Sequence, residues 1–407
     1  MDCSISRVRQ EYGPSGILYD LGSAYEGLCQ LTDVRKAHGK RYSLESVLMV
    51  IVMAKLCGED TPYAIADWAK NHREQLVKLL QLKRESTPSQ RPAPFQGHTI
   101  RRIMGWVVFQ EEIERWVGAY NQCGEHGGVY ALDGKAPRGT RKKDEEEGPE
   151  YLLSIYDVEQ EKVLSQVAVG RKENEITKAP QALKMVEITG KVVTGDAMHT
   201  QRRLAAQILE QGGDYVFPVK ENQLGLYKNI QALFAPEYPK PGFGKIQTDF
   251  LTAQKVNKGH GRIETRIITT SEMLNPYSTW PGLSQVYRLE RQFQWRRSGH
   301  CFRVSNQVEF GIASLARTKS SPSHLLKIRR THWGIETGLH YRRDVTFKED
   351  ATRMTIGNTG KVMASINNLV IALIHQAKFQ NTAQARRYFA GHISEAFLLL
   401  TIPFSRL

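Results

Sequence analysis

The chain has 407 residues, of which 41% are hydrophobic and 24% charged, so it has the composition of an ordinary globular protein with two or three domains. Its net charge of +14 favours a polyanionic partner, with nucleic acid the commonest and an anionic membrane surface the rival. The longest apolar run, residues 46–57, is too short to span a bilayer and contains Lys55, so we expect no membrane partner. Five scattered cysteines without a CxxC pair argue against disulfides and a cysteine zinc site. The N-terminus lacks a secretory signal, and a cytoplasmic protein is expected.

The first part of the chain is predicted to be helical. Apolar residues recur at helical spacing over residues 43–58, 61–82 and 98–123, with a Pro-rich connector before the last of these. The first of these helices has Ser43 as its candidate N-cap and Gly58 at its end. Residues 1–125 are therefore expected to form a helical domain.

The pattern then changes to one of strands. "GGVYALDG" predicts a short strand, residues 150–170 predict a hairpin, and helices alternate with strands up to residue 219. This order is typical of an α/β core. From about residue 243 to residue 315 the pattern predicts strands alone, and from residue 321 helices almost to the end of the chain.

Three acidic residues are candidates for a catalytic site. Asp133 follows the apolar run "VYAL" and Asp196 follows "KVVTG", so each lies at the C-terminal end of a predicted strand, where α/β sheets place ligand-binding groups. Either aspartate alone is also explained as a turn former or helix N-cap. Glu336 lies in the basic, aromatic stretch "HWGIETGLHYRRDVTFKED", either as a solvated ion-pair partner or as a metal ligand.

The combination suits phosphodiester chemistry. Two divalent ions roughly 3.5–4 Å apart can activate the attacking oxygen and stabilise the leaving oxygen. Magnesium prefers oxygen ligands, which three carboxylates supply, and basic residues around them would hold the DNA backbone.

Longer motifs around these acids carry a resemblance to a known family. "ALDGK" with Asp133, "VTGDAMHTQ" with Asp196 and "HWGIETGLHYRRDVTFKEDATR" with Glu336 resemble the DDE transposases of bacterial insertion sequences, in the IS-four-like (ISAs) group. "KENEITKAP", "GGDYVFPVKENQ" and "KGHGRIETR" are also similar, and the resemblance covers roughly residues 20–400. It implies an α/β, ribonuclease H-like catalytic core with an inserted β domain and helical N- and C-terminal flanks.

The resemblance also implies a domain plan. The insertion explains why 140 residues separate Asp196 from Glu336 when only 63 separate Asp133 from Asp196. The expected parts are a helical domain that binds DNA ends (1–125), the first part of the core (126–235), the β-rich insertion (236–318), the core completion with the glutamate helix (319–375) and a C-terminal helical segment (376–407).

The activity implied is DNA cleavage and strand transfer. Asp133, Asp196 and Glu336 would be catalytic and would bind two Mg²⁺ or Mn²⁺ ions. The partners would be double-stranded DNA, as element ends and target, and a second copy of the chain on paired ends, in the bacterial nucleoid. Two alternatives stay open: a catalytically retired DNA-binding protein, and a metal-dependent nuclease of the same fold.

DNA contacts are expected from basic side chains: Lys135, Lys220, His260, Arg262, Arg329, Arg330, His332, Arg343, Lys348 and Arg353. Arg329 and Arg343 lie seven residues either side of Glu336, where they form ordinary ion pairs or clamp a phosphate. His332 and His340 lie four residues either side of it, a spacing that zinc also uses, but no HExxH motif accompanies them. Packing or phosphate contact is the expected role of both histidines.

Overall fold

The computed structural model describes residues 10–403 except 13, 15, 34, 36–41, 83–96, 105–106, 142–150, 171–172, 236–247, 260 and 298–299. The chain divides into two compact units. Unit one contains residues 1–126, 134–173 and 336–407, and unit two contains residues 127–133 and 174–335.

Unit two is built on parallel strands with helices between them. The first residues of β3 (Val129–Lys135) pair in parallel with β6 (Val192–Gly195), and β6 pairs in parallel with β7 (Asp214–Val219). The helices α7 (Glu175–Leu183) and α8 (Arg202–Glu210) precede and follow β6 in the chain. The near-continuous burial of these three short strands is what parallel strands covered on both faces require.

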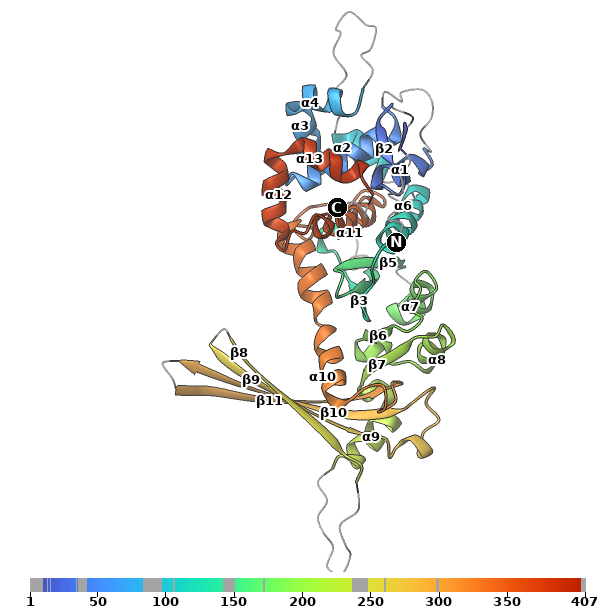
Figure 1. The fold of residues 1–407 in the computed structure, drawn as a ribbon, viewed down its shortest axis with the longest axis vertical. Coiled ribbons are helices and arrows are strands. Elements are labelled where there is room, and N and C mark those ends of the chain that lie inside the picture. Colours follow the sequence, from blue (N-terminus) through green and yellow to red (C-terminus); the bar gives the residue numbers. More distant parts are fainter. Residues whose placement is uncertain are drawn as a thin grey trace, which may run out of the picture. The chain divides into compact units, whose positions relative to one another are not determined.

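The β-rich insertion continues this sheet. β11 (His300–Ala313) pairs antiparallel with β7, so that residues 310–313 lie opposite residues 216–219. Beyond β11 follow β10 (Gln285–Arg297), β9 (Arg262–Ser271) and β8 (Leu251–Gly259), all antiparallel, and they form the long ribbon seen in Figure 1. The sheet of unit two is therefore mixed, and the insertion shares its hydrogen-bond ladder.

Helix α10 (Pro322–Thr331) covers part of this sheet. Its N-cap Ser321 accepts a hydrogen bond from the His324 amide, and the helix packs on β8 and β9. Leu325 and Ile328 on α10 join a buried cluster with Tyr287 of β10. A further helix, α9 (Leu224–Leu233), follows β7 and was not predicted from the sequence.

Unit one is mainly helical. Its hairpin, predicted over residues 150–170, is β4 (Tyr151–Asp157) with β5 (Lys162–Val169). The other elements with six or more residues are α1 (Ala24–Gln30), α2 (Leu44–Leu56), α3 (Pro62–Asn71), α4 (Arg73–Leu79), α5 (Gly97–Met104), α6 (Val107–Asn121), α11 (Thr359–Gln376), α12 (Thr382–Gly391) and α13 (Ile393–Thr401).

Helix α2 is the centre of unit one, and every one of its residues is buried. It packs against α1, α3, α11, α12 and α13. Its predicted bounds are confirmed: Ser43 takes the extended N-cap conformation, and Gly58 after the helix has a positive φ of 108° that suits glycine. The Ser43 hydroxyl donates to Ser46 Oγ and caps no amide.

The segment with the candidate glutamate is helical but irregular. Two π-helical turns, Glu336–His340 and Arg342–Thr346, lie where the sequence predicts a helix. Such wide turns are uncommon and recur at functional sites. Within the described part of the chain, no helix is long and apolar enough to cross a membrane.

Candidate active site

The two candidate aspartates lie near the carboxyl ends of neighbouring strands: Asp133 is two residues before the end of β3, and Asp196 directly follows β6. Leu132 of β3 lies opposite Gly195 of β6 in a parallel pair, and each is followed directly by an aspartate. Neighbouring strands lie about 4.8 Å apart, so Asp133 and Asp196 leave the same edge of the sheet side by side. Asp133 is half-buried and Asp196 is exposed. The strand register thus makes neighbours of two aspartate positions that are 63 residues apart in the sequence.

A histidine holds the second of these carboxylates. His332 Nε2 lies 3.5 Å from Asp196 Oδ1. This contact lowers the pKa of the Asp196 carboxyl, against the effect of its partial burial, and the positive charge of Arg329 adds to the lowering. Asp196 is therefore ionised at neutral pH, as an oxygen ligand for a cation must be.

The imidazole is fixed from its other side as well. His332 is buried, and its Nδ1 lies 3.0 Å from the Thr194 hydroxyl on β6, which also lies 3.4 Å from the Tyr130 carbonyl on β3. Since both ring nitrogens have partners, the ring has one orientation relative to Asp196. The sequence predicted His332 as a DNA contact, and the structure places it behind the carboxylate.

The loop after Asp196 is tied to the end of β7. Asn222 Nδ2 donates to the Ala197 carbonyl (2.7 Å), and Gln223 Nε2 donates to the Thr200 carbonyl (3.0 Å). Lys220, which precedes both, is exposed at this edge. The asparagine of the "VKENQ" motif therefore fixes the loop that carries Asp196.

A cavity of about 970 Å³ opens at this edge, lined among others by Asp196, Lys220, Glu309, Arg329 and His332. All of these residues belong to unit two. Besides the buried ion pair of Glu309, the lining carries two acids, Asp196 and Glu221, and the cations Lys220 and Arg291. Cations of this kind suit a phosphate-bearing ligand.

The ion pair in the cavity wall was missed by the sequence analysis. Arg329 Nε and Nη2 donate to the two carboxylate oxygens of Glu309 on β11 (2.9 and 3.2 Å), and Arg291 Nη2 lies 3.1 Å from the second oxygen. Burial raises the pKa of the Glu309 carboxyl, but these two arginines outweigh burial and hold that pKa below its usual range. The one signal in the sequence was an acid inside the apolar run "QVEFGIA".

Two of the predicted DNA contacts in unit one are instead paired with acids of the chain. Buried Lys135 lies 2.5 Å from Asp344 and 3.9 Å from Asp350. Arg343, fully buried, donates to both carboxylate oxygens of Glu349 (2.7 and 2.5 Å). Each pair supplies the counter-charge that a buried cation needs, because an isolated buried charge would be costly.

The remaining predicted residues are exposed or lie outside the described residues. Lys348, Arg353 and Glu336 are exposed in unit one, and Arg262 and Arg330 are exposed in unit two. Lys348 has a positive φ of 51°, which is strained for lysine. His260 lies outside the residues that the structure describes.

The donor atoms suit a hard divalent cation. Among the described residues, no group of three or more His, Cys, Asp and Glu side chains is arranged to hold a metal ion. The Asp133 and Asp196 pair nevertheless offers carboxylate oxygens, which Mg²⁺ and Mn²⁺ prefer and which need only a few protein ligands beside water and phosphate. The residues present therefore fit such an ion.

These features define an α/β protein with two acids at the carboxyl edge of parallel strands, where such folds bind their ligands. The transposase DDE domain family matches residues 127–373, and the DDE_Tnp_1-associated family matches residues 25–119. The chain belongs to the transposase DDE domain family. This confirms the resemblance to the DDE transposases of insertion sequences. The structure itself confirms an α/β fold with a β-rich insertion and helical flanks.

Relatives of nearly the same length are known from Escherichia coli. "Putative protein YbfL" of strain K12 is 26% identical over 91% of this chain and 98% of its own length. "Putative transposase YncI" of strain O157:H7 is 27% identical over 86% of each chain. "H repeat-associated putative transposase YhhI" of strain K12 is 25% identical over 91% of this chain and 98% of its own. A solved structure of the piggyBac transposase synaptic complex with hairpin DNA is 11% identical over 93% of this chain and 77% of that one, with a TM-score of 0.42.

Proposed function

We propose that this protein is a DNA transposase that cleaves the end of an insertion sequence and joins it to target DNA. The observation that carries the proposal is the register of β3 and β6, which sets Asp133 beside Asp196 in a chain of the DDE family. The net charge of +14 supports a nucleic-acid substrate.

Asp133, Asp196 and Glu336 are the proposed catalytic residues and metal ligands. Two Mg²⁺ or Mn²⁺ ions bound by these carboxylates would supply a nucleophilic oxygen at neutral pH and stabilise charge on the leaving oxygen. Two observations support the inclusion of Glu336: it lies in the family motif, and it is exposed at the start of a π-helical turn.

The chain's own side chains prepare the substrate and the carboxylates. His332 fixes Asp196, and Asn222 fixes the loop behind it. Lys220 is exposed on the same cavity and would bind a phosphate of the DNA strand. In unit one, Lys348 and Arg353 are the exposed cations proposed to hold DNA near Glu336.

Both chemical steps are in-line displacements at phosphorus. In the first step, the oxygen of water forms a bond to the phosphorus at the element end, and the P–O3′ bond breaks. The water molecule loses a proton to solvent, and the leaving O3′ takes up a proton to become the 3′-hydroxyl. In the second, that 3′-hydroxyl attacks a target phosphate, a P–O3′ bond of the target breaks, and no covalent protein intermediate forms. Two ends cut together imply a homodimer on paired ends, acting at the bacterial nucleoid.

The test is strand joining with Mg²⁺ or Mn²⁺, using supercoiled plasmid and labelled duplexes that carry the element ends identified from the flanking genome. Joining by the wild type, with a loss of about 10³-fold or more in Asp196→Asn and Glu336→Gln, is expected because each amide removes one charged oxygen ligand. The matched control is Glu210→Gln, an exposed acid on α8, which should join normally.

The other outcomes separate the alternatives. Cleavage without joining by the wild type would favour a nuclease of the same fold. Metal-independent DNA binding without cleavage or joining would favour a retired DNA-binding protein. Joining by Glu336→Gln at the wild-type rate would remove Glu336 from the site.

A further inference from the structure

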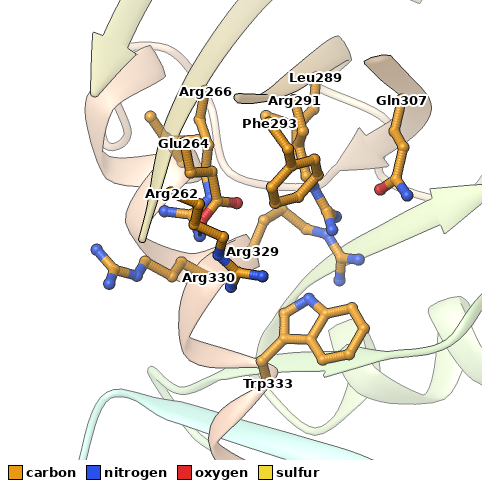
Figure 2. Close-up of a pocket in the computed structure, with 11 residues that line it drawn as sticks. Arg262, Glu264, Arg266, Leu289, Arg291, Phe293, Gln307, Arg329, Arg330 and Trp333 are labelled. Atoms are coloured by element: carbon orange, nitrogen blue, oxygen red, sulfur yellow. Dashed lines mark ion pairs between the residues drawn. The ribbon is translucent and has the colours of Figure 1, made fainter. Parts of the chain in front are cut away.

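Arginines converge on a cleft of about 400 Å³ between the insertion strands and α10 (Figure 2). Phe293, Trp333 and one acid, Glu264, line this arginine cleft together with five arginines. The arginines are Arg262, Arg266, Arg291, Arg329 and Arg330. Arg262 and Arg266 come from β9, Arg291 from β10, and Arg329 and Arg330 from α10. The cations therefore reach one space from three separate elements.

The acids around the cleft do not balance these charges. Glu264 pairs with Arg266 (2.6 Å), and Glu309 is shared by Arg329 and Arg291. Two carboxylates against five guanidinium groups leave an excess of three positive charges among the described residues. Burial lowers the pKa of the Arg266 side chain, and the nearby Arg330 and Arg291 lower it further.

The two exposed arginines use weak partners. Arg262 lies over the Phe293 ring at 5.5 Å from its centroid, and Arg330 Nη1 donates to the Asn257 side-chain oxygen (3.2 Å). A ring face and a neutral amide stabilise a guanidinium far less than a carboxylate or phosphate does. Both side chains are therefore available to a stronger, anionic partner.

A buried donor in the same cleft also lacks a partner. Arg329 is 3% exposed, two of its nitrogens bind Glu309, and its Nη1 makes no hydrogen bond in the described structure. An unsatisfied donor on a buried charged group is costly unless a ligand or water satisfies it. An oxyanion in the cleft would supply the missing acceptor.

We propose that the arginine cleft is a phosphate-binding site that holds one backbone phosphate of the bound DNA strand. Arg262 and Arg330 are its outer cations, and Arg329 is its inner one. Arginine suits this task because its planar fork donates two hydrogen bonds to one phosphate. The inference rests on the proposed function, since it assigns a site for the same DNA.

The position of the cleft indicates which phosphate it holds. Arg291, Gln307, Arg329 and Trp333 line both the arginine cleft and the cavity that contains Asp196. The two spaces share a wall within unit two, so a strand in the Asp196 cavity passes the cleft directly. The phosphate bound there lies close to the one that is cleaved, and it would position that strand.

The test replaces single phosphates of the element-end duplex by neutral methylphosphonates, position by position, and measures equilibrium binding. In the wild type, one position near the cleavage point should weaken binding about tenfold, as expected for one lost charge-assisted contact. In Arg262→Gln and in Arg330→Gln, the methylphosphonate at that position should no longer weaken binding. The plot of log K against log salt should become shallower, its slope decreasing in magnitude by about 0.9. Arg203→Gln, an exposed arginine on α8, is the matched control and should keep the wild-type pattern.

A second arm uses inorganic pyrophosphate at constant ionic strength, with thermal unfolding as the readout. Pyrophosphate should stabilise the wild type and Arg203→Gln, and the double variant Arg262→Gln/Arg330→Gln should lose this stabilisation. If pyrophosphate gives this result but the wild type does not join strands, the cleft binds anions and the proposed function is wrong. If joining succeeds but no methylphosphonate position loses its effect in the variants, the cleft does not hold DNA phosphate and the inference is overturned.

Discussion

Glu309→Gln tests whether the ion pair in the cavity wall stabilises unit two. The substitution keeps the shape of the side chain but leaves Arg329, which is 3% exposed, opposite a neutral amide. Removing one partner of a buried ion pair costs about 3–5 kcal/mol, because the other charge stays buried and unpaired. At about 2–4 °C per kcal/mol for a unit of this size, the melting temperature should fall by roughly 6–20 °C in differential scanning calorimetry at pH 7.

Two variants make this test specific. Glu290→Gln is the matched control, because Glu290 lies 3.4 Å from Arg288 in a half-buried pair on β10 that solvent still reaches, and solvent-accessible pairs contribute less than about 1 kcal/mol. The double variant Glu309→Leu/Arg329→Met removes both charges together and should recover most of the loss. Equal melting temperatures for Glu309→Gln and Glu290→Gln would refute the reasoning.

The same pair predicts a pH dependence. The folded-state pKa of Glu309 is lowered, so its contribution to stability is present above the unfolded pKa of about 4.3 and is lost as the pH falls through the folded value. The difference in melting temperature between the wild type and Glu309→Gln should therefore narrow below about pH 4. A constant difference from pH 7 to pH 3 would contradict this assignment.

Two further predictions concern unit one. Burial raises the pKa of Glu114, whose carboxylate accepts a hydrogen bond from Gln110, to about 7; its contribution to stability is complete below about pH 4.5 and lost as the pH rises through 7. In the wild type, the free energy of unfolding measured by urea titration should therefore decrease by roughly 3 kcal/mol between pH 4.5 and 8. Glu114→Gln should not show this decrease, and an unchanged pH profile in the variant would contradict the assignment. Lys348 has a positive φ, so Lys348→Gly should be more stable than Lys348→Ala by about 1 kcal/mol, while both lose the same DNA affinity in a binding titration. Equal stability of the two variants would remove the argument from backbone strain.

Much of the local structure was predictable because it depends on nearby residues. The helix between Ser43 and Gly58, the hairpin of residues 150–170 and the strands next to Asp133 and Asp196 follow from apolar periodicity, caps and turns. The motifs around the acids were sufficient for the family, and the family match over residues 127–373 confirms it. Irregular local geometry was not predictable, as the π-helical turn at Glu336 illustrates.

The sequence by itself therefore determined the order of helices and strands, the acids at their ends and the excess of basic residues. The tertiary structure decided which of these residues meet. Asp133 and Asp196 become neighbours only through the register of β3 with β6. Arg329 binds Glu309 only because β11 pairs with β7 and places Glu309 within hydrogen-bond distance. Whether a basic residue is buried in an ion pair, as Arg343 is, or free to bind DNA depends on a carboxylate brought close by the fold, and no local pattern specifies that distance.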